Sequence, residues 1–232
     1  KLNSKKTQAD KDLMTMYAEA NKELQELYDL EGSDKMQILK LLTRLRQLCL
    51  EPRLVYDNID QPSSKLKACM ELIKTMQENK QKVLLFSSFT SVLDLIAEEC
   101  QKAGITYYML TGSTNKEDRR ELVSRFQKDD TTVFLISLKA GGTGLNLTSA
   151  EAVIHFDPWW NVSAQNQATD RAYRIGQKNN VQVFNLVMKD SVEEKIIELQ
   201  KRKKELADMF VENNSGGLSQ MSKEDILSLF TM

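Results

Sequence analysis

The chain has 232 residues, enough for one domain of ordinary size with added helices or for two small domains. Its 32 Lys and Arg residues balance 33 Asp and Glu residues, which excludes a globally basic nucleic-acid-binding protein, so any basic surface must be local. Cys49, Cys69 and Cys100 are scattered and odd in number, which argues against a disulfide framework and a zinc site. No apolar run approaches the ~20 residues that span a bilayer, which argues against a membrane protein.

Two long helices are predicted at the start of the chain. Residues 8–50 contain almost no glycine or proline and repeat apolar residues at intervals of three and four. The break DLEGSDK joins the two helices, and EPRLVYDNIDQPSS ends the section with two prolines and a serine pair that can cap the next helix. We therefore expect a helical segment over residues 1–62. The chain lacks an initial Met and a signal peptide, so we expect it to be a fragment of an intracellular protein.

From residue 63 to 190 the pattern changes to short apolar runs that alternate with amphipathic segments. Strands are expected at KVLLFS, TYYML, TTVFLIS, AVIHF and VQVFNLV. The helices between them predict an α/β fold with a parallel sheet covered on both faces. Residues 191–232 then predict a long amphipathic helix, a flexible NNSGGLSQ link and a short helix KEDILSLF.

The loop SLKAGGTGLNLTSA follows a predicted strand directly, where ligands collect in open parallel sheets. Its glycines allow backbone amides to approach a phosphate, and three side chains add donors. These residues are Gly141, Gly142 and Gly144, with Ser137, Lys139 and Thr143. A turn that only needs glycine is an equally good interpretation from spacing alone. No G-K-[ST] sequence occurs, so the loop is not a Walker A motif.

The loop HFDPWWNVSAQ ends the next strand with an acid and two tryptophans. Trp159 and Trp160 could stack on a base or sugar, although packing is the simpler interpretation for one of them. Asp157 faintly resembles a Walker B acid, but that interpretation fails without a partner phosphate loop. His155 lies within the strand and is expected in the core rather than in catalysis.

The segment QNQATDRAYRIGQ places three polar side chains at helical spacing. Gln167, Arg171 and Arg174 would share one side of a helix, and planar guanidinium groups suit phosphate oxygens. A solvated face with Asp170 pairing its neighbours is the alternative. The order of a Gly-rich loop, a strand and this helix on one rim favours an anion site. A Thr-Gly-Ser turn in YMLTGSTNKEDRR leads into a helix N-terminus, which is another candidate anion site.

Together these segments resemble the second RecA-like lobe of the SWI/SNF-type DNA-dependent ATPases, in helicase superfamily two. KVLLFSSF is similar to motif IV, LISLKAGGTGLNLTSAEAVIHFDPWWN to motif V with its extension, and QATDRAYRIGQ to motif VI. The helical LLTRLRQLCLEPRL and the helix after residue 190 are also similar to family segments. One departure is Val162, where the family usually has proline after PWWN.

The resemblance implies a role for each candidate residue. Arg171 and Arg174 match the arginine fingers that reach the γ-phosphate of ATP. ATP-binding residues are then expected to include Gln167, Gly142 and Gly144. Contacts to the phosphates of one DNA strand are expected from Thr111, Gly112, Ser113, Lys139 and Thr143, with Trp160 coupling or stacking beside the track.

The family binds ATP and Mg²⁺ through Walker A and Walker B motifs on its first lobe, and neither motif occurs here. The chain alone is therefore predicted not to hydrolyse ATP, and we expect no metal site within it. Joined to its first lobe, it is expected to be a DNA-dependent ATPase that moves along double-stranded DNA, with a DNA-bound protein as a remodelling substrate. The resemblance places it in the cytoplasm or nucleoid of a prokaryote, which is favoured, or in a eukaryotic nucleus.

Two other functions remain open from the sequence. One is a strand-separating DNA or RNA helicase that uses the same lobe. The other is a non-enzymatic nucleic-acid or protein-binding module, in which the α/β core is a scaffold and the long helices make the contacts.

Overall fold

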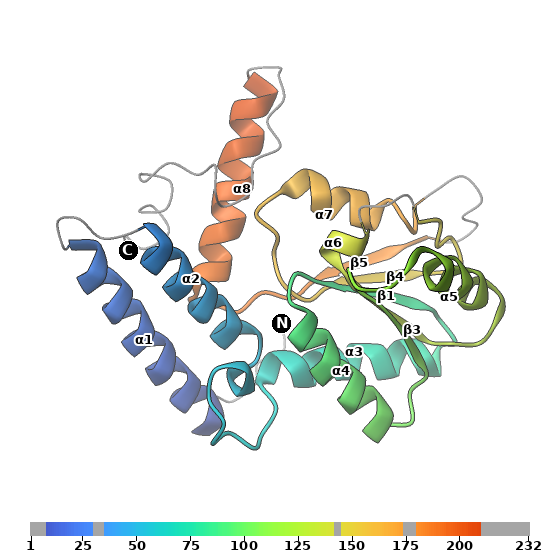
Figure 1. The fold of residues 1–232 in the computed structure, drawn as a ribbon, viewed down its shortest axis with the longest axis horizontal. Coiled ribbons are helices and arrows are strands. Elements are labelled where there is room, and N and C mark those ends of the chain that lie inside the picture. Colours follow the sequence, from blue (N-terminus) through green and yellow to red (C-terminus); the bar gives the residue numbers. More distant parts are fainter. Residues whose placement is uncertain (1–7, 30–34, 142–144, 174–179, 210–232) are drawn as a thin grey trace.

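The computed structural model describes residues 8–29, 35–141, 145–173 and 180–209 (Figure 1). Its centre is a five-stranded sheet in the order β2-β3-β1-β4-β5, and every strand pair is parallel. The strands are β1 (Val83–Ser87), β2 (Tyr107–Leu110), β3 (Val133–Ser137), β4 (Ala152–His155) and β5 (Gln182–Asn185). The α/β fold with a parallel sheet that the sequence predicts is therefore confirmed.

The central strands are the apolar runs of the sequence. Every residue of β1, β3 and β4 is buried, as expected for strands that are covered on both faces. The edge strands differ, since β2 is half-buried and β5 is mostly exposed. The three central strands are therefore fully buried, and the two edge strands are more exposed.

Helices cover both faces of the sheet (Figure 1). On one face lie α3 (Ser64–Glu78) and α4 (Thr90–Lys102), whose apolar sides pack against alternate residues of β1 and β3. The opposite face is covered by the helices α5 (Lys116–Lys128), α6 (Leu138–Gly141) and α7 (Val162–Thr169). This two-sided packing leaves the loops at the carboxyl ends of the strands as the accessible edge.

A second hydrophobic core lies beside the sheet. It is formed by α1 (Gln8–Asp29), α2 (Lys35–Leu50) and α8 (Val192–Met209), and its fully buried members include Leu45, Leu48 and Ile196. The short 3-10 helix η1 (Pro52–Leu54) leads from α2 toward α3. Segments from the N-terminal and C-terminal parts of the chain thus share one core. The predicted division of the chain into three parts at residues 62 and 190 stays a prediction.

A buried ion pair ties this helical core to the sheet. Lys65 Nζ on α3 lies 2.6 Å and 2.7 Å from the two carboxylate oxygens of Glu193 on α8. The Met188 amide donates a further hydrogen bond to Glu193.

Within the described ranges, no helix is both long enough and apolar enough to cross a membrane.

Candidate nucleotide and nucleic-acid interface

Because all the strands are parallel, the loops that follow β2, β3 and β4 meet at one edge of the sheet. The described candidate residues lie on these loops and on the helices that begin there. Four candidates, Gly142, Thr143, Gly144 and Arg174, fall outside the described residues.

The turn after β2 presents exposed hydroxyl groups. Thr111 Oγ1 and Ser113 Oγ are 2.8 Å apart, and the Thr111 amide donates to Thr114 Oγ1 at 3.1 Å. Gly112 and Ser113 are exposed, and nothing lies within 4 Å of the position that a Cβ on Gly112 would take. Asn115 caps α5 by accepting the Asp118 amide at 2.8 Å. The turn therefore leads into a capped helix N-terminus, as the sequence predicts.

The loop after β3 begins with the short helix α6. Leu138 and Ala140 are buried in the sheet core, whereas Lys139 between them is exposed. Arg119 on α5 donates from Nη1 to the carbonyl of Ala140 at 3.3 Å. The buried neighbours fix the backbone of α6, so the Lys139 ammonium group is held at the accessible edge.

The carboxylate after β4 is a structural hub rather than a catalytic acid. Asp157 is 1% exposed and accepts hydrogen bonds from Ser87 Oγ at 2.7 Å and the Ser88 amide at 3.0 Å. Its second oxygen accepts from Arg46 Nη2 at 3.1 Å and from the Ser88 hydroxyl. Burial lowers the pKa of Arg46, an effect that Asp157 opposes. A buried carboxylate with this many donors has little capacity left for a ligand.

The two tryptophans are both half-buried and pack on different cores. Trp159 packs against the sheet core, whereas Trp160 packs against the helical core. The guanidinium group of Arg46 lies 5.6 Å from the Trp160 ring centroid and 4.9 Å from that of Phe89. Trp160 thus joins the helical core to the edge of the sheet, and its predicted role beside DNA stays a prediction.

The predicted helix over QNQATDRAYRIGQ was wrong in extent. Helix α7 ends at Thr169, and residues 170–173 form turns. Hydrogen bonds from Arg171 N to Ala168 O and from Ala172 N to Thr169 O tighten the chain, since they span three residues instead of four. Ala168 and Ala172 anchor this turn in the sheet core. Tertiary packing therefore overrides the helical spacing.

Two side chains that the sequence analysis placed together differ in exposure. Gln167 is exposed, whereas Arg171 is only 6% exposed. The Arg171 carbonyl accepts the Leu147 amide at 3.0 Å, which ties the turn to the segment after the Gly-rich loop. Arg171 is thus held by the backbone around it, close to the loop that follows β3.

The start of α7 explains the one departure from the family pattern. Val162 is the first residue of the helix, and Asn161 caps it by accepting the Ala164 amide at 3.2 Å. The first helical position tolerates proline because its amide needs no partner within the helix. Valine is accommodated there for the same reason, so the local turn is kept.

His155 is in the core, as predicted. It is 1% exposed, and its ring stacks on Phe86 with centroids 5.6 Å apart. Its Nε2 lies 2.9 Å from Thr169 Oγ1, at the last residue of α7. Burial lowers the pKa of His155 to about 4. A neutral imidazole therefore connects β4 to the end of the helix that precedes Arg171.

The sequence analysis missed Arg46 and Arg119. Arg46 is four residues from the buried Leu42 and from the buried Leu50, so it lies on the apolar side of α2, and a lone arginine on such a side is the signal that could have found it. Arg119 gives no comparable signal in a helix as polar as α5. Its partner, the Ala140 carbonyl, is defined only by the folded structure.

The parallel sheet, the basic and hydroxyl-bearing loops at its carboxyl edge, and the adjoining helical core define a RecA-like lobe. The family model for the helicase conserved C-terminal domain matches residues 64–176. An uncharacterized ATP-dependent helicase of Mycoplasma pneumoniae is 37% identical over 213 residues, which cover 91% of this chain and 21% of that protein.

Two solved structures extend the comparison. The C-terminal part of the Fun30 ATPase domain is 31% identical, with a TM-score of 0.60 over 92% of this chain and 72% of that one. The Sulfolobus solfataricus SWI2/SNF2 ATPase core in complex with dsDNA is 30% identical, with a TM-score of 0.75 over 94% of this chain and 47% of that one.

The chain belongs to the helicase C-terminal domain family and, within it, to the C-terminal RecA-like lobes of the SWI/SNF-type ATPases. It spans 21% to 22% of the length of the first curated relatives that it matches.

Proposed function

We propose that this chain is the second motor lobe of an ATP-dependent translocase on double-stranded DNA. The observation that carries the proposal is the shared carboxyl edge of the Thr111–Ser113 turn and Lys139, together with the hydrogen bond that joins the Arg171 turn to the segment after the Gly-rich loop. Helix α6 packs on α7, and the Leu147 amide donates to the Arg171 carbonyl, so the segments that we propose to face DNA and the nucleotide are in direct contact. A movement of either segment would therefore displace the other.

In this proposal Arg171 and Arg174 stabilise the charge that develops on the γ-phosphate. An arginine supplied in this way accelerates phosphoryl transfer by roughly 10³ to 10⁵ in other nucleotide triphosphatases. Gln167, Gly142 and Gly144 would lie around the nucleotide, while a first RecA-like lobe holds most of ATP and Mg²⁺. The two lobes would be parts of one longer chain, and hydrolysis would require both.

The DNA contacts are proposed for the turn after β2 and the loop after β3. Hydroxyl groups and backbone amides at Thr111, Gly112 and Ser113, with Lys139 and Thr143, suit phosphate oxygens and carry no base preference. Trp160 would lie beside this track. The Sulfolobus relative was solved with dsDNA, which supports a duplex as the substrate. A DNA-bound protein is then the remodelling target.

The test compares nucleic acids as activators of the protein that joins this chain to its first lobe. ATP turnover is measured with duplex DNA, single-stranded DNA and RNA, and strand separation is followed with a labelled duplex. Strong stimulation by duplex DNA without unwinding is expected. Stimulation by a single strand together with unwinding would indicate a strand-separating helicase, and no stimulation by any nucleic acid would indicate a binding module.

A further inference from the structure

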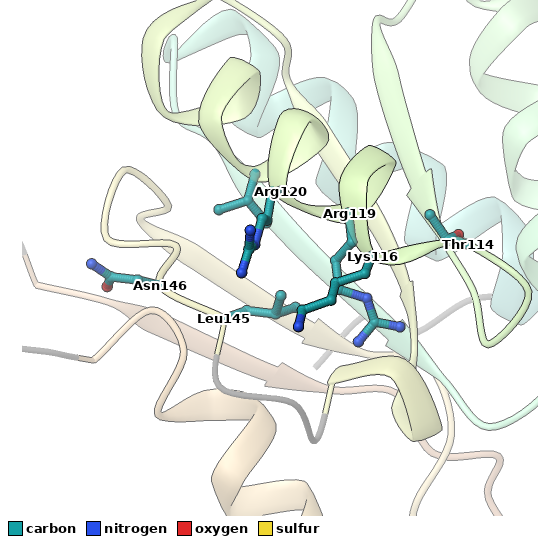
Figure 2. Close-up of a pocket in the computed structure, with 7 residues that line it drawn as sticks. Thr114, Lys116, Arg119, Arg120, Leu145 and Asn146 are labelled. Carbon is teal, nitrogen blue, oxygen red and sulfur yellow. The ribbon is translucent and has the colours of Figure 1, made fainter.

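A cationic groove lies between α5 and the segment that follows α6 (Figure 2). It has a volume of about 600 Å³, and its cationic wall consists of Lys116, Arg119 and Arg120. Leu145 and Asn146 contribute the facing wall. The function proposed above assigns none of these residues.

The three cations share one wall because of helical spacing. Lys116, Arg119 and Arg120 are related by three and four residues, so their side chains emerge on one side of α5. In Figure 2 they extend from α5 toward the segment that carries Leu145 and Asn146. The groove is therefore lined by positive charge and an amide.

Among the described residues that line the groove, none carries a carboxylate that would balance this charge. Asp118 is engaged at the start of α5, where the Asn115 side-chain amide donates to its carboxylate at 2.8 Å. Among the described residues, neither Lys116 nor Arg120 forms an ion pair, whereas Arg125 farther along α5 pairs with Glu121 at 2.5 Å. An uncompensated pair of cations in a groove favours an anionic ligand.

The groove is continuous with the edge at which DNA contacts are proposed. Thr114 lines its end and accepts a hydrogen bond from the Thr111 amide. On the other side, Arg119 binds the carbonyl of Ala140, the residue after Lys139. Thr114 and Arg119 thus link the lining of the groove to both segments at which DNA contacts are proposed.

We propose that this groove binds the sugar-phosphate backbone of the DNA strand beyond the Thr111–Ser113 turn. Lys116 and Arg120 contact phosphates, and the Asn146 amide donates to a phosphate or sugar oxygen. The apolar side chains Val123 and Leu145 in the same lining suit the sugar ring, which an isolated phosphate ion lacks. Arg119 positions the loop after β3. The inference rests on the proposed DNA-translocase function. It adds the groove to the surface that we propose to contact the DNA strand.

The experiment measures affinity for a labelled DNA duplex at several salt concentrations, using the protein that joins this chain to its first lobe. The variant is Lys116→Gln with Arg120→Gln, and the matched control is Arg125→Gln on the same helix. Each phosphate contact contributes about 0.9 to the slope of log affinity against log salt. The double variant should lose up to about 1.8 of that slope and bind roughly tenfold more weakly, while the control is unchanged.

A Lys139→Gln variant separates this inference from the function on which it rests. If Lys139→Gln weakens DNA binding while the double variant keeps the original affinity and slope, the groove inference is overturned and the proposed function stands. If the unmodified protein does not bind DNA, both fail.

Discussion

The carboxyl ends of β4 and β2 offer opposite environments for polar groups. At β4 the Asp157 carboxylate is buried and satisfied by Ser87, Ser88 and Arg46. At β2 the hydroxyl groups of Thr111 and Ser113 bond to each other and remain accessible. Buried polar groups whose hydrogen bonds are all formed within the protein hold a loop in one conformation, whereas exposed polar groups can exchange a bound water for a ligand. The first end is therefore a scaffold, and the second is the accessible surface at which we propose contacts to DNA.

The largest change in stability is expected at the scaffold end. Asp157→Ala would leave the guanidinium group of Arg46, which is 6% exposed, without its carboxylate, and breaking a buried pair in this way costs about 3–5 kcal/mol. The free energy of unfolding from urea titration checks this. Removing Arg46 as well should cost less in the Asp157→Ala background than in the unmodified chain.

The matched control breaks an exposed pair. Glu121→Ala removes the partner of Arg125, and both side chains are more than half exposed, so the cost should be about 0–1 kcal/mol. Equal costs for Glu121→Ala and Asp157→Ala would contradict the contrast between scaffold and surface.

A smaller, pH-dependent loss is expected at His155. Its pKa is lowered from the ordinary 6.5 to about 4, so the unfolded chain binds more protons than the folded chain between these values. The resulting stability is present above pH 6.5 and is lost as the pH falls toward 4, by up to about 3 kcal/mol. Urea titration of the unmodified chain and of His155→Phe from pH 7 to pH 4 checks this, because the variant lacks the titrating group. An equal pH dependence in both would exclude His155 as its source.

An effect smaller than those at Asp157 and His155 is expected at the start of α5, beside the turn after β2. Asn115→Ala removes the side-chain cap and should cost about 1 kcal/mol, whereas Asn115→Ser keeps a capping oxygen and should be nearly neutral. Thermal unfolding of the two variants provides the comparison. If Asn115→Ser is as destabilising as Asn115→Ala, the cap is not what stabilises this helix end.

The strands and the fold class could be predicted because burial on both faces requires continuous apolar sequence. β1 and β3 are five-residue apolar runs that end in serine, and the structure pairs them in register. The exposed turn after β2 could also be predicted, because its glycine and hydroxyl residues interrupt the apolar sequence of the strand. These features depend on local sequence.

The end of α7 and the role of Arg46 could not be predicted, because both depend on distant contacts. Arg46 and Asp157 are 111 residues apart in the chain, and their pairing exists only after α2 is placed beside the loops that follow β1 and β4. Helix α7 ends where Ala168 and Ala172 pack into the core and the Arg171 carbonyl meets Leu147. Helical spacing alone cannot show where such packing replaces the regular hydrogen bonds.

The central claim is that Arg171 completes an ATPase site shared with a first lobe. The direct measurement is ATP turnover at saturating duplex DNA for Arg171→Lys and Arg171→Ala in the joined protein, with Arg125→Ala as the exposed control. We predict a loss of about 10³-fold or more for both Arg171 variants and normal turnover for the control, with the DNA affinity of Arg171→Lys close to that of the unmodified protein. Because Arg171 is 6% exposed, thermal unfolding of each variant is measured alongside to separate a loss of catalysis from a loss of fold. Normal turnover in both Arg171 variants would contradict the account.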